Sequence, residues 1–138
     1  MEWIHENLPY RISDAKEQLR VNAIQAMLQT SYWAADRDTE TIARCVDHSL
    51  CLGVYGESGQ VGFLRAVSDY TTITWFCDVI VHPEHRGQGL GKWLMQTATC
   101  HPDLRGTNMM LGTRDAHGLY EQYGFERKEM MGRRKVAD

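Results

Sequence analysis

The stretch DVIVHPEHRGQGLGK, residues 78–92, joins a predicted buried strand to a predicted helix through a glycine-rich turn. Residues 74–81 are apolar, β-branched or aromatic at nearly every position, which is typical of a buried strand. Pro83 ends this strand because it has no N–H for a ladder. Apolar residues within 90–98 then follow the i, i+3, i+4, i+7 spacing of an amphipathic helix. The predicted order is therefore strand, turn, helix.

The turn is suited to binding an anion. Gly87, Gly89 and Gly91 stand on alternate positions, so the backbone can approach a ligand closely. The first turn of the following helix presents unpaired N–H groups at the positive end of its dipole. Arg86 and Lys92 add positive charge on either side of the glycines. These features predict a phosphate-binding loop.

The two best-known phosphate loops do not fit this turn. A Walker loop needs Gly at position 86 and Ser or Thr at position 93, where the chain has Arg86 and Trp93. The dinucleotide fingerprint needs Gly at position 92, where the chain has Lys92. The sequence therefore argues against a nucleoside triphosphatase and against a Rossmann dehydrogenase.

The pattern Arg86-x-x-Gly89-x-Gly91 resembles the coenzyme A pyrophosphate loop of the GNAT superfamily of N-acetyltransferases. A second motif, AxxLYExxGF at residues 116–125, resembles the tyrosine-bearing helix of that superfamily and the strand after it. Both motifs stand in the family's order and context. They cover the C-terminal half of the chain, and the N-terminal half agrees in the order of its elements only.

The length of 138 residues fits one domain over residues 1–138, and the resemblance implies a mixed α/β fold for it. Its central sheet is expected to be mostly antiparallel and to be flanked by about four helices. Expected helices cover residues 21–30, 39–48, about 90–100 and about 115–123. Expected strands cover residues 10–13, 50–55, 61–67, 74–81 and 109–112, and a last strand begins at residue 125.

The resemblance also assigns the coenzyme site, with acetyl-coenzyme A as the cofactor. In the family, a kink in the central strand exposes backbone groups to the acetyl carbonyl and to the pantetheine arm. The matching backbone positions are Val79, Ile80 and Val81, and the Val79 N–H is the expected donor to the oxyanion. The pyrophosphate is expected at the loop residues Arg86, Gly87, Gln88, Gly89, Leu90, Gly91 and Lys92.

Two residues are candidates for catalysis. Tyr120 matches the tyrosine that protonates the coenzyme sulfur in many family members, and its alternative role is aromatic packing. Asp78 precedes the backbone site and is a candidate base acting through water, or a group that orients the amine. Strand alternation can instead turn Asp78 away from the site. His82 and His85 are further candidates, although they stand at the coenzyme end of the turn.

The resemblance further implies that the acceptor meets the segment between the first two helices. Tyr32, Trp33, Asp36 and Asp38 lie there, a mixture suited to a cationic or aromatic amine. In the alternative interpretation the two aromatic side chains cover the core and the two acids cap helices.

Composition narrows the choice of partners. The net charge of −3 gives no overall basic field, so nucleic acid is not an expected partner. No apolar run approaches the ~20 residues of a membrane span, and the first residues do not form a signal peptide. We therefore expect a cytoplasmic protein with no membrane partner. The four cysteines lack paired spacing, which indicates reduced thiols and no metal site.

These features together predict an enzyme that transfers an acetyl group to a primary amine. We expect a small-molecule acceptor that attacks acetyl-coenzyme A directly in a ternary complex. The alternatives are a protein or peptide N-acetyltransferase and a non-catalytic sensor of acyl-coenzyme A. The assembly is left open, with a homodimer as one possibility.

Overall fold

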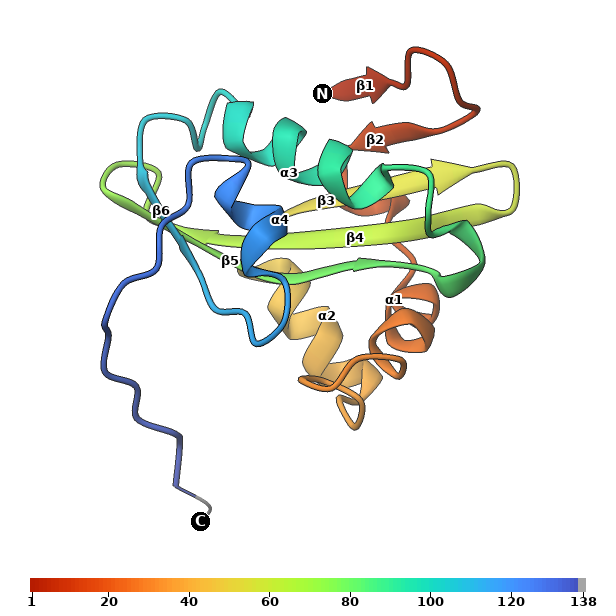
Figure 1. Ribbon diagram of the computed structural model, residues 1–138. Helices are drawn as coiled ribbons and strands as arrows, with labels where there is room; N and C mark the ends of the chain where they lie inside the picture. Colours follow the sequence, from red (N-terminus) through yellow and green to blue (C-terminus); the bar gives the residue numbers. More distant parts are fainter. Residues whose placement is uncertain (137–138) are drawn as a thin grey trace.

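The computed structural model describes residues 1–136 and, within them, a six-stranded sheet and four α-helices (Figure 1). The strands, in the same order along the chain and across the sheet, are β1 (Glu2–Ile4), β2 (Arg11–Ser13), β3 (Leu50–Gly56), β4 (Gly59–Ser68), β5 (Ile73–Val81) and β6 (Asn108–Leu111). The helices are α1 (Val21–Leu28), α2 (Thr39–Asp47), α3 (Leu90–Cys100) and α4 (His117–Glu121). All neighbouring strands pair antiparallel except β5 and β6, so the expected mixed, mostly antiparallel sheet is confirmed.

Helices cover both faces of the sheet. Figure 1 shows α1 and α2 on one face and α3 and α4 on the other. Successive side chains of β4 point to opposite faces of the sheet, because side chains alternate along a strand. Leu64 packs in the cluster that contains Leu94 of α3, and Phe63 packs in the cluster that contains Ile24 of α1 and Ile42 of α2. The central strands are therefore buried on both faces.

A β-bulge interrupts β5 at Asp78 and Val79. Phe63 of β4 pairs with Ile80, and Arg65 pairs with Cys77, so one residue of β4 opposes two of β5. Asp78 has a φ of 55°, a left-handed conformation that is rare for a residue with a side chain. A bulge bends its strand and re-aims the neighbouring groups. The bulge therefore kinks β5 at Asp78 and Val79, directly before and at the first of the matched positions Val79, Ile80 and Val81.

The pairing between the two parallel strands ends where β6 ends, after four residues, whereas β5 continues. Their pairing runs from Ile73 with Asn108 to Phe76 with Leu111 and ends there. The rest of β5, residues 77–81, stays paired to β4 by way of the bulge. The opening between the diverging chains faces α4 and the first turn of α3. This separation positions the site described below.

Two segments differ from the sequence-based expectation. The last strand expected from residue 125 is wrong: residues 125–136 hold no helix or strand, and the chain leads away from the sheet (Figure 1). Phe125 still packs beside Phe76 and Tyr120, but the residues after it are mainly charged and exposed, and none of them pairs with a described strand. At the other end, the unexpected strand β1 pairs with β2. No helix among residues 1–136 is long and apolar enough to cross a membrane.

Candidate active site

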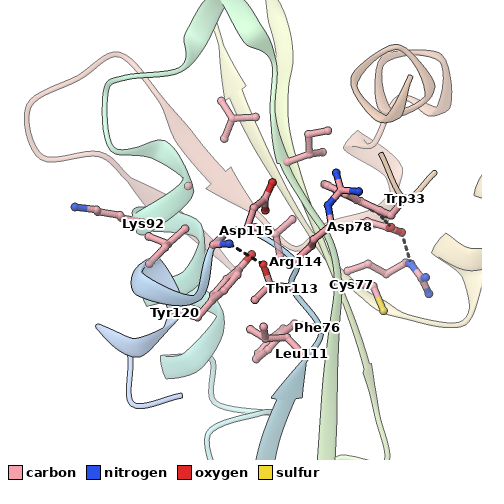
Figure 2. A pocket seen from close by; sticks show the side chains of 18 of the residues that line it. Trp33, Phe76, Cys77, Asp78, Lys92, Leu111, Thr113, Arg114, Asp115 and Tyr120 are labelled. Atoms are coloured by element: carbon pink, nitrogen blue, oxygen red, sulfur yellow. Dashed lines mark hydrogen bonds and ion pairs between the residues drawn. The ribbon is translucent and has the colours of Figure 1, made fainter. Parts of the chain in front are cut away.

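A cleft of about 860 Å³ occupies the opening between β5 and β6 (Figure 2). The segment between α1 and α2, the β5 bulge, the glycine turn, the loop after β6 and α4 all contribute to its wall. The cleft brings together most of the predicted site residues: Tyr32, Trp33, Asp78, Val79, Ile80, Val81, Arg86, Gly87, Gly89, Leu90, Gly91, Lys92 and Tyr120. Figure 2 shows Lys92 and Tyr120 on one side of the cleft and Asp78 and Trp33 on the other.

Two predicted site residues are not among the described residues that line the cleft. Asp36 is exposed in the segment between α1 and α2. The side chain of Gln88 donates to the Tyr10 hydroxyl at 3.0 Å and to the His85 carbonyl at 3.3 Å. Gln88 therefore ties the glycine turn to Tyr10, the residue that precedes β2.

The glycine turn presents open backbone to the cleft. Gly87 and Gly89 have φ values of 85° and 81°, and Gly89 is the N-cap of α3. A Cβ at either glycine, or at Gly91, would meet no described heavy atom within 4 Å. The first N–H groups of α3 have no acceptor inside the helix, so they can bind an anion here.

The side chain of Arg86 is fixed beside the glycine turn by two hydrogen bonds. Its Nε donates to the Val81 carbonyl at 2.9 Å, and its guanidinium donates to the Thr30 hydroxyl at 3.3 Å. The side chain thus places a fixed positive charge between the end of β5 and the helix N-terminus. This combination suits a phosphate or pyrophosphate group.

Asp78 is the centre of a buried ion cluster. Its side chain is 3% exposed, and its Oδ2 accepts from Arg37 at 2.7 Å and from Arg65 at 3.0 Å. Its Oδ1 accepts from the indole N–H of Trp33 at 2.9 Å. Both carboxylate oxygens are thus engaged, which suits a positioning role. The general-base assignment of Asp78 stays a prediction.

The backbone beside this cluster is exposed to the cleft. Asp78 and Val79 have no partner residue in β4, and β6 has already separated from β5 at this level. The bulge therefore frees backbone groups from the ladder where the cleft is lined by Val79, Ile80 and Val81. Such groups are available to a ligand that lies along β5.

Tyr120 reaches the cleft from α4. Figure 2 shows its ring directed toward Thr113 and the interior of the cleft. Burial raises the pKa of the Tyr120 phenol above its ordinary value, and the nearby Tyr32 and Asp115 raise it further. A raised pKa keeps the phenol protonated at neutral pH, which a proton donor requires.

The structure adds three arginines that the sequence analysis did not single out. Arg37, Arg65 and Arg114 all line the cleft on the side of Trp33 and Asp78. The sequence alone could have pointed to Arg65, because it is a charged residue inside an apolar strand. Arg37 and Arg114 lie in loops, where nothing in the sequence distinguishes them from other charged residues. Ala116 is the N-cap of α4, and the Thr113 hydroxyl accepts the Ala116 backbone N–H at 3.0 Å.

Comparison with known proteins defines the class. The acetyltransferase (GNAT) domain family matches residues 29–127, which is most of the chain. The fold and the glycine turn agree with that match. The chain therefore belongs to the GNAT acetyltransferases.

Individual relatives support the same assignment. A Xanthomonas campestris protein described as a GNAT-family acetyltransferase is 38% identical, with a TM-score of 0.87, over 96% of this chain and 95% of its own. A Gibberella zeae protein described as an acetyltransferase is 29% identical over 63% of this chain, and the match spans only 60% of that relative's length. The ribosomal-protein-S18-alanine N-acetyltransferase of Escherichia coli is 21% identical with a TM-score of 0.70, over 87% of this chain and 79% of its own, which shows the fold alone.

Proposed function

We propose that this chain transfers the acetyl group of acetyl-coenzyme A to the primary amine of a small molecule, by direct attack in a ternary complex. One observation carries the proposal. A single cleft joins an anion-binding helix N-terminus, a bulged strand with freed backbone groups and a buried tyrosine. These are the parts that binding and cleaving a thioester of this coenzyme require.

The coenzyme is proposed to lie across the glycine turn and along β5. Its pyrophosphate meets the N–H groups at the start of α3, with Arg86 and Lys92 as counter-charges. The pantetheine arm, which carries amide groups, follows the free edge of residues 79–81. The thioester then lies beside the bulge and within reach of the α4 side of the cleft.

The proposed reaction needs one proton donor and one oxyanion donor. The neutral amine attacks the thioester carbon, and the new C–N bond forms as the carbonyl oxygen becomes an oxyanion that the Val79 N–H stabilises. The C–S bond then breaks, and the departing thiolate takes the phenolic proton of Tyr120. The proton lost by the amine passes to solvent, from which the Tyr120 phenolate is reprotonated.

Asp78 is proposed to position the site rather than to act as the base. Its carboxylate holds Trp33, Arg37 and Arg65 around the bulge, and its own left-handed backbone forms part of that bulge. Loss of these contacts would move the Val79 N–H relative to the thioester.

The test is amine-dependent release of coenzyme A thiol, with the acetylated product identified by its mass. We expect thiol release that requires both a small primary amine and the protein. Transfer only to protein or peptide amines would replace the small-molecule acceptor with the peptide alternative. Tight binding of acetyl-coenzyme A without transfer to any amine would favour the sensor alternative and overturn the proposal.

A further inference from the structure

One end of the cleft carries arginine side chains that take no part in the proposed coenzyme contacts. Arg86 and Lys92 stand at the glycine turn, whereas Arg37 and Arg65 bind Asp78 and Arg114 stacks on Tyr32, which packs against Trp33. Only two carboxylates, those of Asp78 and Asp115, line the cleft among residues 1–136. The end of the cleft that faces the attacking amine therefore carries a net positive charge.

The ion cluster at Asp78 leaves donors unused. A guanidinium has several N–H groups and cannot be deprotonated in a protein. Within the described residues the Arg37 guanidinium makes one hydrogen bond, from Nη1 to Asp78. Its side chain is 22% exposed at the cleft wall, so its other donors can meet a ligand.

Arg114 is pre-organised by an aromatic stack. Its guanidinium carbon lies 3.7 Å from the ring centroid of Tyr32, and the Tyr32 hydroxyl accepts the Arg114 backbone N–H at 3.2 Å. Tyr32 in turn packs edge-on against Trp33, with ring centroids 5.1 Å apart. Stacking uses the face of the guanidinium and leaves its in-plane donors for a bidentate acceptor. No described carboxylate forms an ion pair with Arg114.

We propose that the acceptor amine carries an oxyanion, a carboxylate or a phosphate, which binds the guanidinium groups of Arg37 and Arg114. This inference rests on the proposed function, since it names the substrate class of the same site. It differs from the cationic acceptor expected from the sequence, because Asp36, which was to meet that cation, lies outside the cleft lining.

The same charges assist the reaction. Nearby positive groups disfavour the ammonium form of a bound amine and so raise the fraction that is a neutral nucleophile. An acceptor without an anion would be repelled by the arginines, whereas an anionic acceptor offsets that repulsion with charge-assisted hydrogen bonds. Substrate charge therefore separates productive acceptors from polyamines and other purely cationic amines.

The test compares matched amines in the thiol-release assay. One pair is β-alanine and β-alaninamide, and the other is O-phosphoethanolamine and ethanolamine, so the two pairs distinguish a carboxylate from a phosphate. We expect at least one anionic member to have the higher kcat/KM, and Arg114→Gln to lower that preference by about 10- to 100-fold, mainly through KM. Arg114→Lys should restore part of it. The matched control Arg105→Gln removes an exposed charge outside the cleft and should leave the preference unchanged.

The outcomes separate this inference from the proposed function. Equal or greater use of the amines that lack an anion, or a preference that survives Arg114→Gln, would overturn the anion subsite while N-acetyl transfer stands. If no amine is acetylated, calorimetric titration of β-alanine and O-phosphoethanolamine into the protein with coenzyme A decides. Binding that Arg114→Gln abolishes would support the subsite and overturn the proposed function, and the absence of binding would overturn both.

Discussion

Replacing Asp78 with Asn tests whether the buried ion cluster holds the bulge. The substitution keeps the shape of the side chain and removes its charge, so the guanidinium groups of Arg37 and Arg65 lose their shared acceptor. Asn tolerates the left-handed backbone found here, with φ of 55°, so the change adds little backbone strain. The experiment therefore isolates the charge.

The expected loss is large because the cluster is shielded from water. The side chains of Asp78, Arg37 and Arg65 are 3%, 22% and 14% exposed. Removing one partner of a buried pair costs about 3–5 kcal/mol, since the remaining charge is left without compensation. The new amide also places its N–H donors against either the guanidinium donors or the indole N–H of Trp33. We expect the free energy of unfolding to fall by about that amount.

Urea unfolding at neutral pH measures this loss. For m-values of about 1–3 kcal/mol/M, the midpoint should fall by at least about 1 M. Asp103→Asn is the matched control, because Asp103 is exposed and its carboxylate has no ion-pair partner among residues 1–136, so its midpoint should not change. A loss below about 1 kcal/mol for Asp78→Asn would match an exposed ion pair and would mean that the cluster does not hold the bulge.

Three further changes test other parts of the account. Tyr120→Phe should lower kcat by about 10²-fold with unchanged affinity for acetyl-coenzyme A, whereas the control Tyr123→Phe should leave kcat unchanged. Full activity of Tyr120→Phe would mean that Tyr120 only packs. Gly89→Val should weaken coenzyme binding in calorimetric titrations by at least about tenfold, because the left-handed φ and the open approach are both lost, whereas Gly106→Ala should bind normally. The Asp69 carboxylate accepts three backbone N–H groups of its own turn, and these hydrogen bonds lower its pKa below the unfolded value. Its contribution to stability is therefore present above about pH 4 and is lost as pH falls through the folded pKa. The urea midpoint of the wild type should therefore fall more steeply than that of Asp69→Asn below about pH 4, and parallel curves would contradict this.

The sequence predicted the features that depend on neighbouring residues. The glycine turn and α3 follow from local backbone requirements, and Asp38 caps α2, as the alternative interpretation had it, accepting the Thr41 N–H at 2.8 Å. The bulge was predicted only through the family resemblance. Its bonding partners could not be predicted, because Trp33, Arg37 and Arg65 come from two other segments and meet Asp78 only after folding.

For the same reason, the positive charge at the acceptor end of the cleft could not be predicted from the sequence. The acids near Trp33 suggested a cation, but one of them, Asp38, caps a helix and the other, Asp36, lies outside the cleft lining. Charge in the cleft comes instead from arginines in separate elements. The strand expected from residue 125 was wrong because a strand needs a pairing partner, and residues 125–136 have none among the described strands.

The central claim is that acetyl-coenzyme A binds in the opening between β5 and β6. The most direct measurement is a titration of isotope-labelled protein with acetyl-coenzyme A, followed through the backbone amide resonances. If the coenzyme binds there, the largest shifts fall on residues 79–81 of β5 and on residues 89–92 at the start of α3. Shifts confined to the α1 and α2 face of the sheet, or no shifts at saturating coenzyme, would contradict it.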